Sequence, residues 1–458
     1  MPETYDVVVL GAGTGGYATA LRAASLDLKV AMVERDKIGG TCLNVGCIPT
    51  KALLHSADVY DTMRDAETFG VTASNVTYDW AGVQKRKDAV VERMIKGLAS
   101  TLKARKVETI TGTGTITAKD TVTVDGTALG TKNIVIATGS KPKMIPGLEI
   151  GDRIITSDEA LSMDHVPTSA VILGAGAIGV EFASLWASFG CKVTVVEMLP
   201  SLVPLEDPDA GKELARAFRK RGITSMVGAK LEEAKAGADG VTCRVSVDGK
   251  TETIEADVLL VAVGRGPVTD GAGLESIGVA TDRGFVVVDE YCRTNVENVY
   301  AVGDVIPTLQ LAHVSFAEGM LAAEQIAGKQ VAPLDYDAMP RATYCDPEVS
   351  SVGLTEPQAK EQGFEIETKS VGFGHIGKAA ILNKTTGFCK IVAEKGSGRI
   401  LGVHMVGPHV TDLLAEAMLA YGWEATAGDI APFIHPHPTL SEVFGETALA
   451  LAGRPLHA

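Results

Sequence analysis

Two cysteines with four residues between them, Cys42 and Cys47, follow a glycine-rich loop and a strand-like run near the start of the chain. Such a thiol pair can pass two electrons between its disulfide and a redox cofactor held by the loop. A regular helix would be a poor host for the bridge, because residues five apart lie about 140° apart around its axis. A disulfide needs converging side chains with Cα atoms roughly 4.4–6.8 Å apart. The backbone around the pair must therefore be irregular if the two form a bridge.

The neighbouring residues provide that irregularity. Gly39, Gly40 and Gly46 loosen the backbone, and Pro49 lacks a backbone donor near a helix start. We expect both cysteines on an irregular first turn, followed by a regular helix from about residue 49 through 57, in a helical pattern that extends over residues 50–64. A bridge that closes so short and accessible a loop would be reducible rather than structural. Two alternatives remain, a pair of unpaired buried thiols and half of a metal site, although zinc sites usually have a second cysteine or histidine pair nearby and none follows.

A motif that occurs twice gives the cysteine pair its nucleotide context. A strand-like run leads into Gly11, Gly13 and Gly16, an apolar-periodic stretch follows, and a second strand-like run ends at Glu34. The same four positions recur in register later in the chain, as Gly174, Gly176, Gly179 and Glu197. One such glycine motif is weak evidence, but two in register, each between a strand and a helix and each with its acidic residue, predict two dinucleotide-binding folds. Glycines that serve tight packing alone are the structural alternative, and the duplication argues against it.

The residue types of the motif suit a pyrophosphate. The first glycine permits the tight turn, the second lets the backbone approach the pyrophosphate, and the third allows close packing of helix on strand. The pyrophosphate then lies at a helix N-terminus, where N–H groups and the helix dipole favour negative charge. Glu34 and Glu197 would accept hydrogen bonds from ribose hydroxyls, and Glu197 is followed by Met198, Leu199 and Pro200 without a basic residue. A carboxylate there repels a 2′-phosphate, which favours NAD over NADP at the second site.

The position of the cysteine pair distinguishes the two sites. The first motif lies beside Cys42 and Cys47, so its cofactor has to exchange electrons with thiols. A flavin reacts with thiolates and also accepts hydride, whereas a nicotinamide transfers hydride in one step. We therefore assign FAD to the first site and NAD to the second.

Two further buried-strand runs end in residues that suit ligand contacts. One run ends at Thr138 and Gly139, and another ends at Asp304. Ligands of open α/β sheets lie at the carboxyl ends of parallel strands. Asp304 could bind a ribityl or ribose hydroxyl, or it could cap the helix expected over residues 312–326, and the sequence leaves both possibilities open.

Near the C-terminus, His435 and His437 alternate with prolines, and Glu442 follows five residues after the second histidine. The prolines restrict the backbone and hold the imidazoles rigidly. A thiol-exchange enzyme needs a base that titrates near neutral pH, and a carboxylate on the other ring nitrogen would orient it. A rigid surface loop with structural histidines is the alternative, and the local sequence does not choose between the two histidines.

The composition sets the broad class. The chain has 458 residues, 46% of them hydrophobic, with seven cysteines and a formal net charge of −15. This length suits about three domains, and the cysteines are too sparse for a disulfide-rich secreted scaffold. The negative charge argues against nucleic-acid and anionic membrane partners, no apolar run suggests a membrane span, and no metal is expected. The N-terminus enters a strand at once and leaves no room for a targeting peptide, so we expect a cytoplasmic protein.

The segments 39–51 and 435–442, with the two glycine motifs, make the chain similar to the dihydrolipoamide dehydrogenase family of FAD- and NAD-linked disulfide oxidoreductases. The resemblance extends over residues 5–451. It implies that protein-bound dihydrolipoamide is oxidised and NAD⁺ is reduced. It also implies a homodimer whose active site is shared between subunits, and a lipoyl-bearing acyltransferase or an H-protein-like carrier as partner.

The resemblance also assigns roles to single residues. Cys42 corresponds to the thiol that exchanges with the lipoyl group, and Cys47 to the thiol packed on the flavin. His437 matches the catalytic base, acting on the partner subunit's disulfide, and Glu442 its orienting carboxylate. Lys51 and Glu181 match a pair near the flavin and the nicotinamide; the residues alone would indicate a solvated helix lysine and a first-turn helix charge. The residues expected to contact a cofactor are Gly11, Gly13, Gly16, Glu34, Thr41, Lys51, Thr138, Gly139, Gly174, Gly176, Gly179, Glu197, Gly264, Asp304 and Ala312.

We expect an α/β fold with two Rossmann-like dinucleotide-binding domains, a central segment and a C-terminal α+β dimerisation domain. The expected divisions are residues 1–143 for FAD, 144–268 for NAD with a hairpin-like insertion over 242–254, 269–338 completing the FAD site, and 339–458 for the interface. The last should contain an antiparallel sheet backed by helices.

Three other functions compete with this interpretation. Glutathione-type reductases would have basic residues after Glu197, and none follows directly here. Mercuric or large thioredoxin reductases would have cysteines at the C-terminus, and residues 452–458 contain none. The cysteine pair disfavours a pyridine-nucleotide transhydrogenase. A non-catalytic flavoprotein would not need Cys42, Cys47, His437 and Glu442 together. Which 2-oxoacid or glycine-cleavage complex the chain serves is not encoded in these motifs.

Overall fold

The computed structural model describes residues 4–457, and its residue contacts divide the chain into two compact units. The first combines three segments, residues 1–52, 81–143 and 264–336, and the second combines residues 53–80, 144–263 and 337–458. The helices α3 (Cys47–Arg64) and α4 (Trp80–Ala104) carry the chain between these segments. The expected division into four domains stays a prediction.

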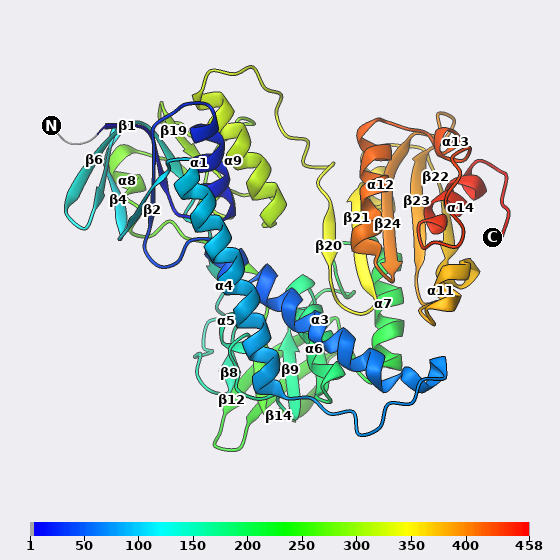
Figure 1. The fold of residues 1–458 in the computed structure, drawn as a ribbon. Coiled ribbons are helices and arrows are strands. Elements are labelled where there is room, and N and C mark those ends of the chain that lie inside the picture. The colour runs from blue at the N-terminus through cyan, green and yellow to red at the C-terminus, as the bar shows by residue number, and fades with distance from the viewer. Residues whose placement is uncertain (1–3, 458) are drawn as a thin grey trace. The chain divides into compact units, whose positions relative to one another are not determined.

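The first unit is built on a mixed sheet with the strand order β3-β2-β1-β6-β5-β4, in which β19 adds to β6 (Figure 1). Strands β1, β2, β3, β6 and β19 pair in parallel, while β4, β5 and β6 form an antiparallel meander. The strands are β1 (Thr4–Leu10), β2 (Val30–Glu34), β3 (Glu108–Thr111), β4 (Gly114–Ala118), β5 (Thr121–Val124), β6 (Thr127–Ile136) and β19 (Val299–Ala301).

Helices α1 (Thr14–Ser25) and α9 (Ala312–Ile326) lie side by side in this unit, so the helix expected over residues 312–326 is confirmed (Figure 1). The central strands read as continuous apolar runs because both their faces are covered. Val7, Val8 and Val9 of β1 are all inaccessible to solvent. The smaller elements are α2 (Gly40–Asn44), α8 (Leu274–Ile277), the paired strands β7 (Ser140–Pro142) and β16 (Arg265–Pro267), and the paired strands β17 (Thr281–Asp282) and β18 (Phe285–Val286).

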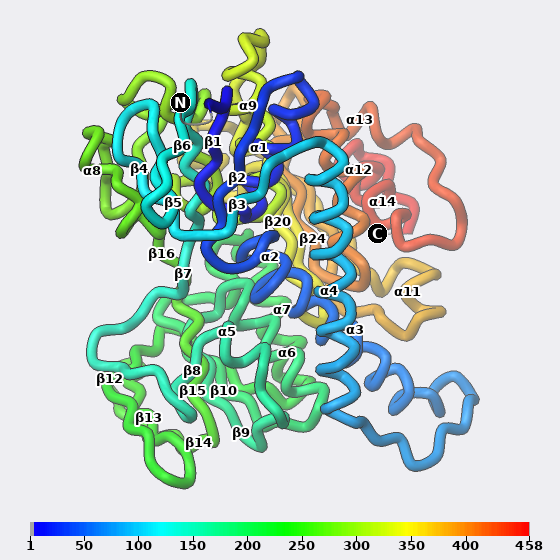
Figure 2. Tube along the Cα trace, turned by 60° about the vertical axis from the view of Figure 1, so that its left-hand side comes forward, coloured from blue at the N-terminus to red at the C-terminus, as the bar shows by residue number. Residues whose placement is uncertain are grey.

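The second unit contains a parallel sheet with the order β11-β10-β9-β15-β8 and a separate antiparallel sheet β12-β13-β14 (Figure 2). The latter confirms the hairpin expected over residues 242–254 and adds a third strand to it. The elements are β8 (Ile154–Ile155), α5 (Ser157–Ala160), β9 (Ser169–Leu173), α6 (Ala177–Ser188), β10 (Lys192–Glu197), α7 (Pro208–Lys220), β11 (Thr224–Val227), β12 (Ala229–Ala236), β13 (Val241–Val247), β14 (Lys250–Ala256) and β15 (Val258–Val261).

The rest of the second unit is an antiparallel sheet with the order β20-β21-β24-β23-β22, as expected. Val352 on β21 lies opposite Val403 on β24, and both are fully buried under α12 and α14. The elements are β20 (Arg341–Thr343), β21 (Glu348–Gly353), α10 (Glu356–Glu361), β22 (Ile366–Gly372), α11 (Gly377–Ile381), β23 (Phe388–Glu394), β24 (Ile400–Gly407), α12 (Val410–Gly422), α13 (Ala427–Ile430) and α14 (Glu442–Leu451).

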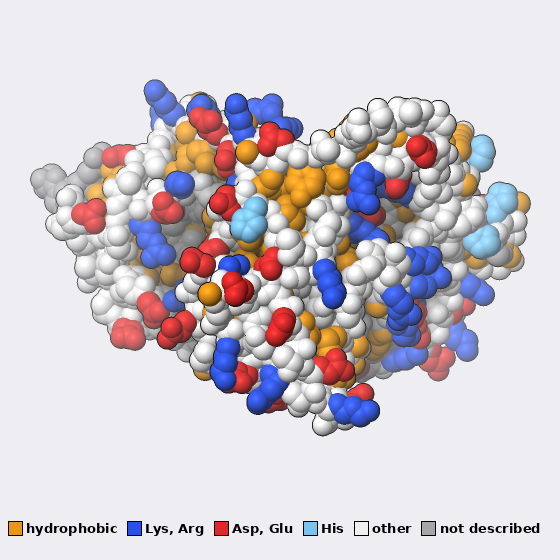
Figure 3. Space-filling view, turned by 90° about the horizontal axis from the view of Figure 1, so that it is seen from below, with side chains coloured by type: hydrophobic (Ala, Val, Ile, Leu, Met, Phe, Trp, Pro, Cys, Tyr) orange, Lys and Arg blue, Asp and Glu red, His pale blue; other side chains and the backbone are white. Residues whose placement is uncertain are grey.

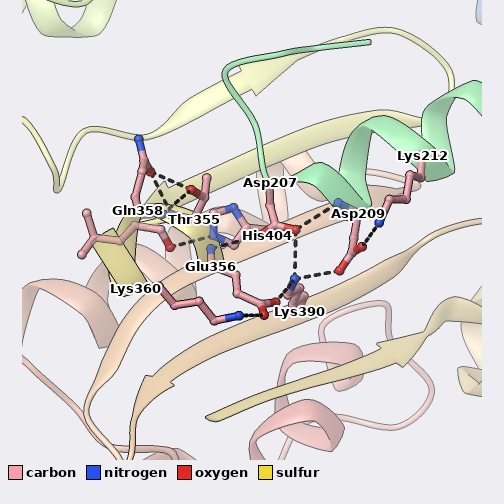
Figure 4. Close-up of polar contacts among 10 residues, drawn as sticks. Asp207, Asp209, Lys212, Thr355, Glu356, Gln358, Lys360, Lys390 and His404 are labelled. Carbon is pink, nitrogen blue, oxygen red and sulfur yellow. Dashed lines mark hydrogen bonds and ion pairs between the residues drawn. The ribbon is translucent and has the colours of Figure 1, made fainter. Parts of the chain in front are cut away.

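A buried ion cluster joins α7 to this antiparallel sheet (Figure 4). The Lys390 ammonium on β23 lies 3.0 Å from Asp207, 2.7 Å from Asp209 and 2.8 Å from Glu356. Its side chain is only 5% exposed, and Asp207 is completely buried. Burial alone would lower the pKa of Lys390, but the three carboxylates raise it above the usual lysine value, so Lys390 stays charged. The charge is therefore compensated inside the protein and not by solvent.

No helix within residues 4–457 combines the length and the apolar character needed to cross a membrane. Figure 3 shows acidic as well as basic side chains across the face that it displays. In the part of the chain that the structure describes, no group of three or more His, Cys, Asp or Glu side chains is arranged to hold a metal ion.

Candidate active site

The cysteine pair lies at a break between two helices. Cys42 is on α2, which ends at Asn44, and Cys47 is the first residue of α3. At the break, a Cβ atom on Gly46 would lie 2.8 Å from the carbonyl oxygen of Thr41, so the glycine is required for the close turn. The expected irregular backbone is confirmed.

Helix α3 runs from Cys47 to Arg64, so it begins two residues before the expected start at residue 49 and ends where the helical pattern over residues 50–64 predicts. The helical hydrogen bonds already begin at Gly46, whose carbonyl accepts the Thr50 N–H at 3.1 Å and the Thr50 hydroxyl at 2.6 Å. Pro49 then occupies a first-turn position, where a missing donor costs nothing.

Cys42 and Cys47 are present as thiols that contact each other. A hydrogen bond to Cys47 raises the pKa of Cys42 far above the usual thiol value, and burial adds to this effect. The positive charge of Lys51, one turn along α3, acts in the opposite direction. The two thiols are coupled, so they titrate as a pair and not as two independent groups.

The first glycine loop has the geometry of a phosphate-binding turn. Gly11 has φ +108°, and a Cβ atom on Gly16 would lie 1.9 Å from the Gly11 carbonyl oxygen. Helix α1 begins directly after Gly13, and no side chain caps its N-terminus. Its first N–H groups are therefore available to an anion. A Cβ atom on Gly40 would lie 2.6 Å from the Gly13 Cα, which places the helix of Cys42 directly against this loop.

The second glycine loop has the same backbone geometry as the first. Gly174 has φ +102°, and a Cβ atom on Gly179 would lie 1.9 Å from the Gly174 carbonyl oxygen. Helix α6 begins after Gly176, again without a side-chain cap. Both loops therefore meet the backbone requirements of a dinucleotide pyrophosphate.

The acidic residue at the end of the second strand is fixed in the same way in both motifs. Glu34 accepts the Ala12 N–H at 2.8 Å and the Asp36 N–H at 2.9 Å. Glu197 accepts the Ala175 N–H at 2.7 Å and the Leu199 N–H at 2.8 Å. Each carboxylate oxygen has a further lone pair, so these bonds orient the group and still allow it to accept ribose hydroxyls.

Asp304 follows β19 in the first unit and does not cap α9. The N-cap of α9 is Leu311, and no side chain caps the helix, so the capping alternative was wrong. Asp304 instead accepts the Ser140 hydroxyl at 2.5 Å. Ala312 is the first residue of α9, and Thr138 donates its hydroxyl to the Val268 carbonyl at 2.5 Å.

Arg265, which was not among the residues expected from the sequence, connects these residues to the cysteine helix. Its Nε donates to the Ser140 hydroxyl at 2.8 Å, and Nη2 donates to the Ser140 carbonyl at 2.9 Å and to Thr41 Oγ1 at 3.3 Å. A polar chain thus extends from Asp304 through Ser140 and Arg265 to the residue before Cys42. The only signal in the sequence was an arginine directly after Gly264, which has φ +106° in the structure.

The two histidines have different partners. Nδ1 of His437 lies 2.8 Å from Glu442, and the His437 side chain is 76% exposed. Nε2 of His435 lies 2.8 Å from Glu416, and its side chain is only 11% exposed. The His437 imidazole is therefore accessible from outside the domain, whereas His435 is largely buried, which favours His437 as the base.

Glu181 is neither exposed nor in the first turn of α6. Its side chain is buried, and Oε1 accepts the Tyr344 N–H at 2.9 Å. The first turn of α6 holds no acidic residue, so the interpretation as a first-turn charge was wrong. Lys51 is half-buried on α3, which also differs from a fully solvated lysine.

Comparison with known proteins identifies the family. Residues 5–319 match the model described as pyridine nucleotide-disulphide oxidoreductase, and residues 339–448 match the dimerisation domain of that family. The chain belongs to the pyridine nucleotide-disulphide oxidoreductases. Residues 339–448 are accordingly a dimerisation domain, and the family uses FAD and NAD as cofactors.

Among curated proteins, the chain is 45% identical to the dihydrolipoyl dehydrogenase of Bacillus subtilis, with 100% of both chains covered. It is 44% identical to that of Chlorobaculum tepidum, over 97% of this chain and 96% of the relative. Among solved structures it resembles LpdA from Mycobacterium tuberculosis, with a TM-score of 0.89 and 25% identity, over 98% of this chain and 99% of that chain. Relatives of this kind are NAD-dependent oxidoreductases, and so is this chain.

Proposed function

We propose that the chain oxidises protein-bound dihydrolipoamide to lipoamide and reduces NAD⁺ to NADH. The observation that carries the proposal is the thiol pair at the helix break, with the helix of Cys42 packed directly on a dinucleotide loop. In this assignment FAD binds the first glycine loop and NAD the second. Bound at the loop of Gly11, Gly13 and Gly16, FAD would supply the two-electron redox chemistry that links the thiols to NAD.

The residues of the chain carry out the thiol chemistry. With the cysteines oxidised to a disulfide, His437 accepts the proton of one substrate thiol, and the resulting thiolate attacks Cys42. The Cys42–Cys47 bond breaks and leaves Cys47 as a thiolate. The second substrate thiol then attacks the substrate sulfur of the mixed disulfide, and its proton passes to the leaving Cys42 sulfur, which releases lipoamide and reduced Cys42. The substrate loses two electrons and the cysteine pair gains them.

The histidine that serves each disulfide belongs, in this proposal, to the other subunit. The exposed His437 lies in the dimerisation domain, where a base can be presented to a partner. A lipoyl-bearing acyltransferase or carrier protein supplies the substrate. We further infer that residues 269–338 complete the FAD-binding domain and that 144–268 form the NAD-binding domain.

The decisive experiment is an anaerobic titration of the purified holoprotein with dihydrolipoamide, followed by NAD⁺. Reduction of the protein by the dithiol and stoichiometric formation of NADH on addition of NAD⁺ are the expected results. If NADH reduces the protein but dihydrolipoamide does not, the lipoamide substrate is wrong while the dinucleotide assignment stands. A monomeric variant with full dihydrolipoamide activity would contradict the shared active site.

A further inference from the structure

Glu318 on α9 is a fully buried carboxyl group to which the proposed reaction gives no role. It is 0% exposed, and it accepts the Gly303 N–H at 2.7 Å, the Thr308 hydroxyl at 2.7 Å and the Tyr336 hydroxyl at 3.1 Å. A buried carboxyl group costs free energy unless such donors compensate it. Gly303 and Thr308 belong to the segment that follows β19 and Tyr336 lies beyond α9, so Glu318 ties both segments to α9.

The bond from Gly303 fixes the turn that carries Asp304. Gly303 lies two residues after the end of β19 and has φ +78°. Its carbonyl accepts the Ile306 N–H at 2.9 Å. Asp304 is the next residue, and its carboxylate is directed at the Ser140 hydroxyl. Burial raises the pKa of Glu318, and the negative charge of Asp304, the residue after the Gly303 that bonds to Glu318, acts in the same direction.

The residue after Glu318 fixes α9 against the first glycine loop. A Cβ atom on Gly319 would lie 2.5 Å from the Gly15 carbonyl oxygen and 3.0 Å from the Thr19 nitrogen. The backbones of α9 and α1 are therefore in direct contact, as the adjacent helices in Figure 1 show. Glu318 and Gly319 together set the position of Asp304 relative to the loop of Gly11 and Gly13.

We propose that Glu318 is a positioning residue for the flavin site, holding the Gly303–Asp304 turn so that the Asp304 carboxylate meets a hydroxyl group of FAD. The inference rests on the proposed assignment of FAD to the first loop. Glu318 itself touches neither cofactor nor substrate. Its effect on FAD binding therefore requires the carboxylate of Asp304.

The test is a double-mutant cycle on FAD affinity, measured by titrating the apoprotein of each full-length variant with FAD and following flavin fluorescence. Glu318→Gln and Asp304→Asn should each weaken binding about tenfold or more, as for the loss of a hydrogen bond to a charged group. The double variant should bind no more weakly than Asp304→Asn alone, because coupled residues are not additive. Thermal midpoints of the apoproteins measure the structural cost separately.

Tyr336→Phe and Thr308→Val each remove one hydrogen bond to Glu318 and keep its carboxyl group. They replace Glu318→Gln in the test if that variant does not fold. Introduced into the wild-type chain, each substitution should weaken FAD binding. Introduced into the Asp304→Asn chain, each should leave the FAD affinity unchanged. Unchanged affinity in Glu318→Gln, or losses that multiply in the double variant, would overturn the inference. Wild-type affinity in Asp304→Asn would remove the role of Asp304, and this inference with it. Failure of the wild-type apoprotein to bind FAD would instead refute the proposed function.

Discussion

Nδ1 of His437 lies 2.8 Å from Oε1 of Glu442, while Oε2 of the same carboxylate accepts the Thr439 N–H at 2.8 Å. Glu442 is thus held at both oxygens. Partial burial acts to raise the pKa of Glu442, but the Thr439 bond and His437 together bring it below the usual glutamate value. The carboxylate is therefore ionised at neutral pH and can orient the imidazole as a catalytic carboxylate does.

His437→Gln should lower kcat for dihydrolipoamide by about 10²–10⁴-fold, the usual contribution of a general base. Glu442→Gln should cause a smaller loss, because the imidazole remains but is less well oriented. The measurement is steady-state turnover at constant flavin content. His435→Gln is the matched control and should retain most activity; an equal loss there would transfer the role of base to His435.

Replacement of Cys42 or Cys47 by serine should abolish dihydrolipoamide oxidation, because the two-electron exchange needs both sulfur atoms. Bound FAD should remain, since the first glycine loop is intact, and NADH should still reduce an artificial acceptor. Flavin content and both activities are measured on the same preparation. A Cys47→Ser protein without flavin would show that Cys47 is mainly structural.

The duplicated loops allow the two cofactors to be separated. Gly16→Ala should prevent FAD binding, and Gly179→Ala should weaken NADH binding while FAD stays bound, because each new Cβ atom would lie 1.9 Å from a carbonyl oxygen. Flavin absorbance and an NADH titration give the two readouts. Gly97→Ala, on α4 with no atom within 4 Å of its Cβ, is the control and should stabilise the helix by about 0.5–1 kcal/mol. The proposed assignment fails if Gly179→Ala loses flavin and Gly16→Ala keeps it.

Lys390→Met should reduce the free energy of unfolding of its domain by about 3–5 kcal/mol, since it leaves the fully buried Asp207 carboxylate without its cation. Urea unfolding followed by circular dichroism measures the loss. Lys360 also pairs with Glu356, with its Nζ 2.7 Å from the carboxylate, but the Lys360 side chain is 59% exposed. Lys360→Met is therefore the matched control. That control should cost no more than about 1 kcal/mol. Equal effects of the two variants would show that the Lys390 cluster is fully hydrated.

The His435–Glu416 pair should make stability depend on pH. The hydrogen bond to Glu416 raises the pKa of His435 in the folded protein above its unfolded value of about 6.5. The folded state then binds the proton more tightly, so the stabilisation is complete below about pH 6.5 and is lost as the pH rises through the folded pKa. Thermal midpoints of the wild type and Glu416→Gln should differ most near pH 6 and converge toward pH 9. A difference that is constant over this range would contradict the expectation.

The duplicated motif could be predicted because its requirements are local. Gly16 and Gly179 lie five residues from Gly11 and Gly174, so the close contact between them depends only on the loop and the first helical turn. The hairpin expected over residues 242–254 is local in the same way, because β13 and β14 follow each other directly in the chain. Short-range spacing is sufficient in each of these cases.

The parts that could not be predicted depend on contacts between distant residues. Arg265 reaches Ser140 and Thr41 across more than a hundred residues of sequence, and no local pattern marks it. No local pattern distinguishes Glu181 from other glutamates on helices. Its burial and its bond from the Tyr344 N–H are visible only in the folded structure. His435 and His437 are each followed by a proline, and their tertiary partners are what distinguish them.

Strand β19 adds to β6 although the whole segment between residues 144 and 263 separates them in the chain. As the polypeptide leaves the ribosome, that edge of β6 lacks its partner until residues 299–301 emerge, on the order of ten seconds later at typical rates of synthesis. An unpaired parallel edge is a site for misassociation. The nascent chain is therefore most vulnerable to aggregation during this interval, and a chaperone that covers β6 would have the most effect then.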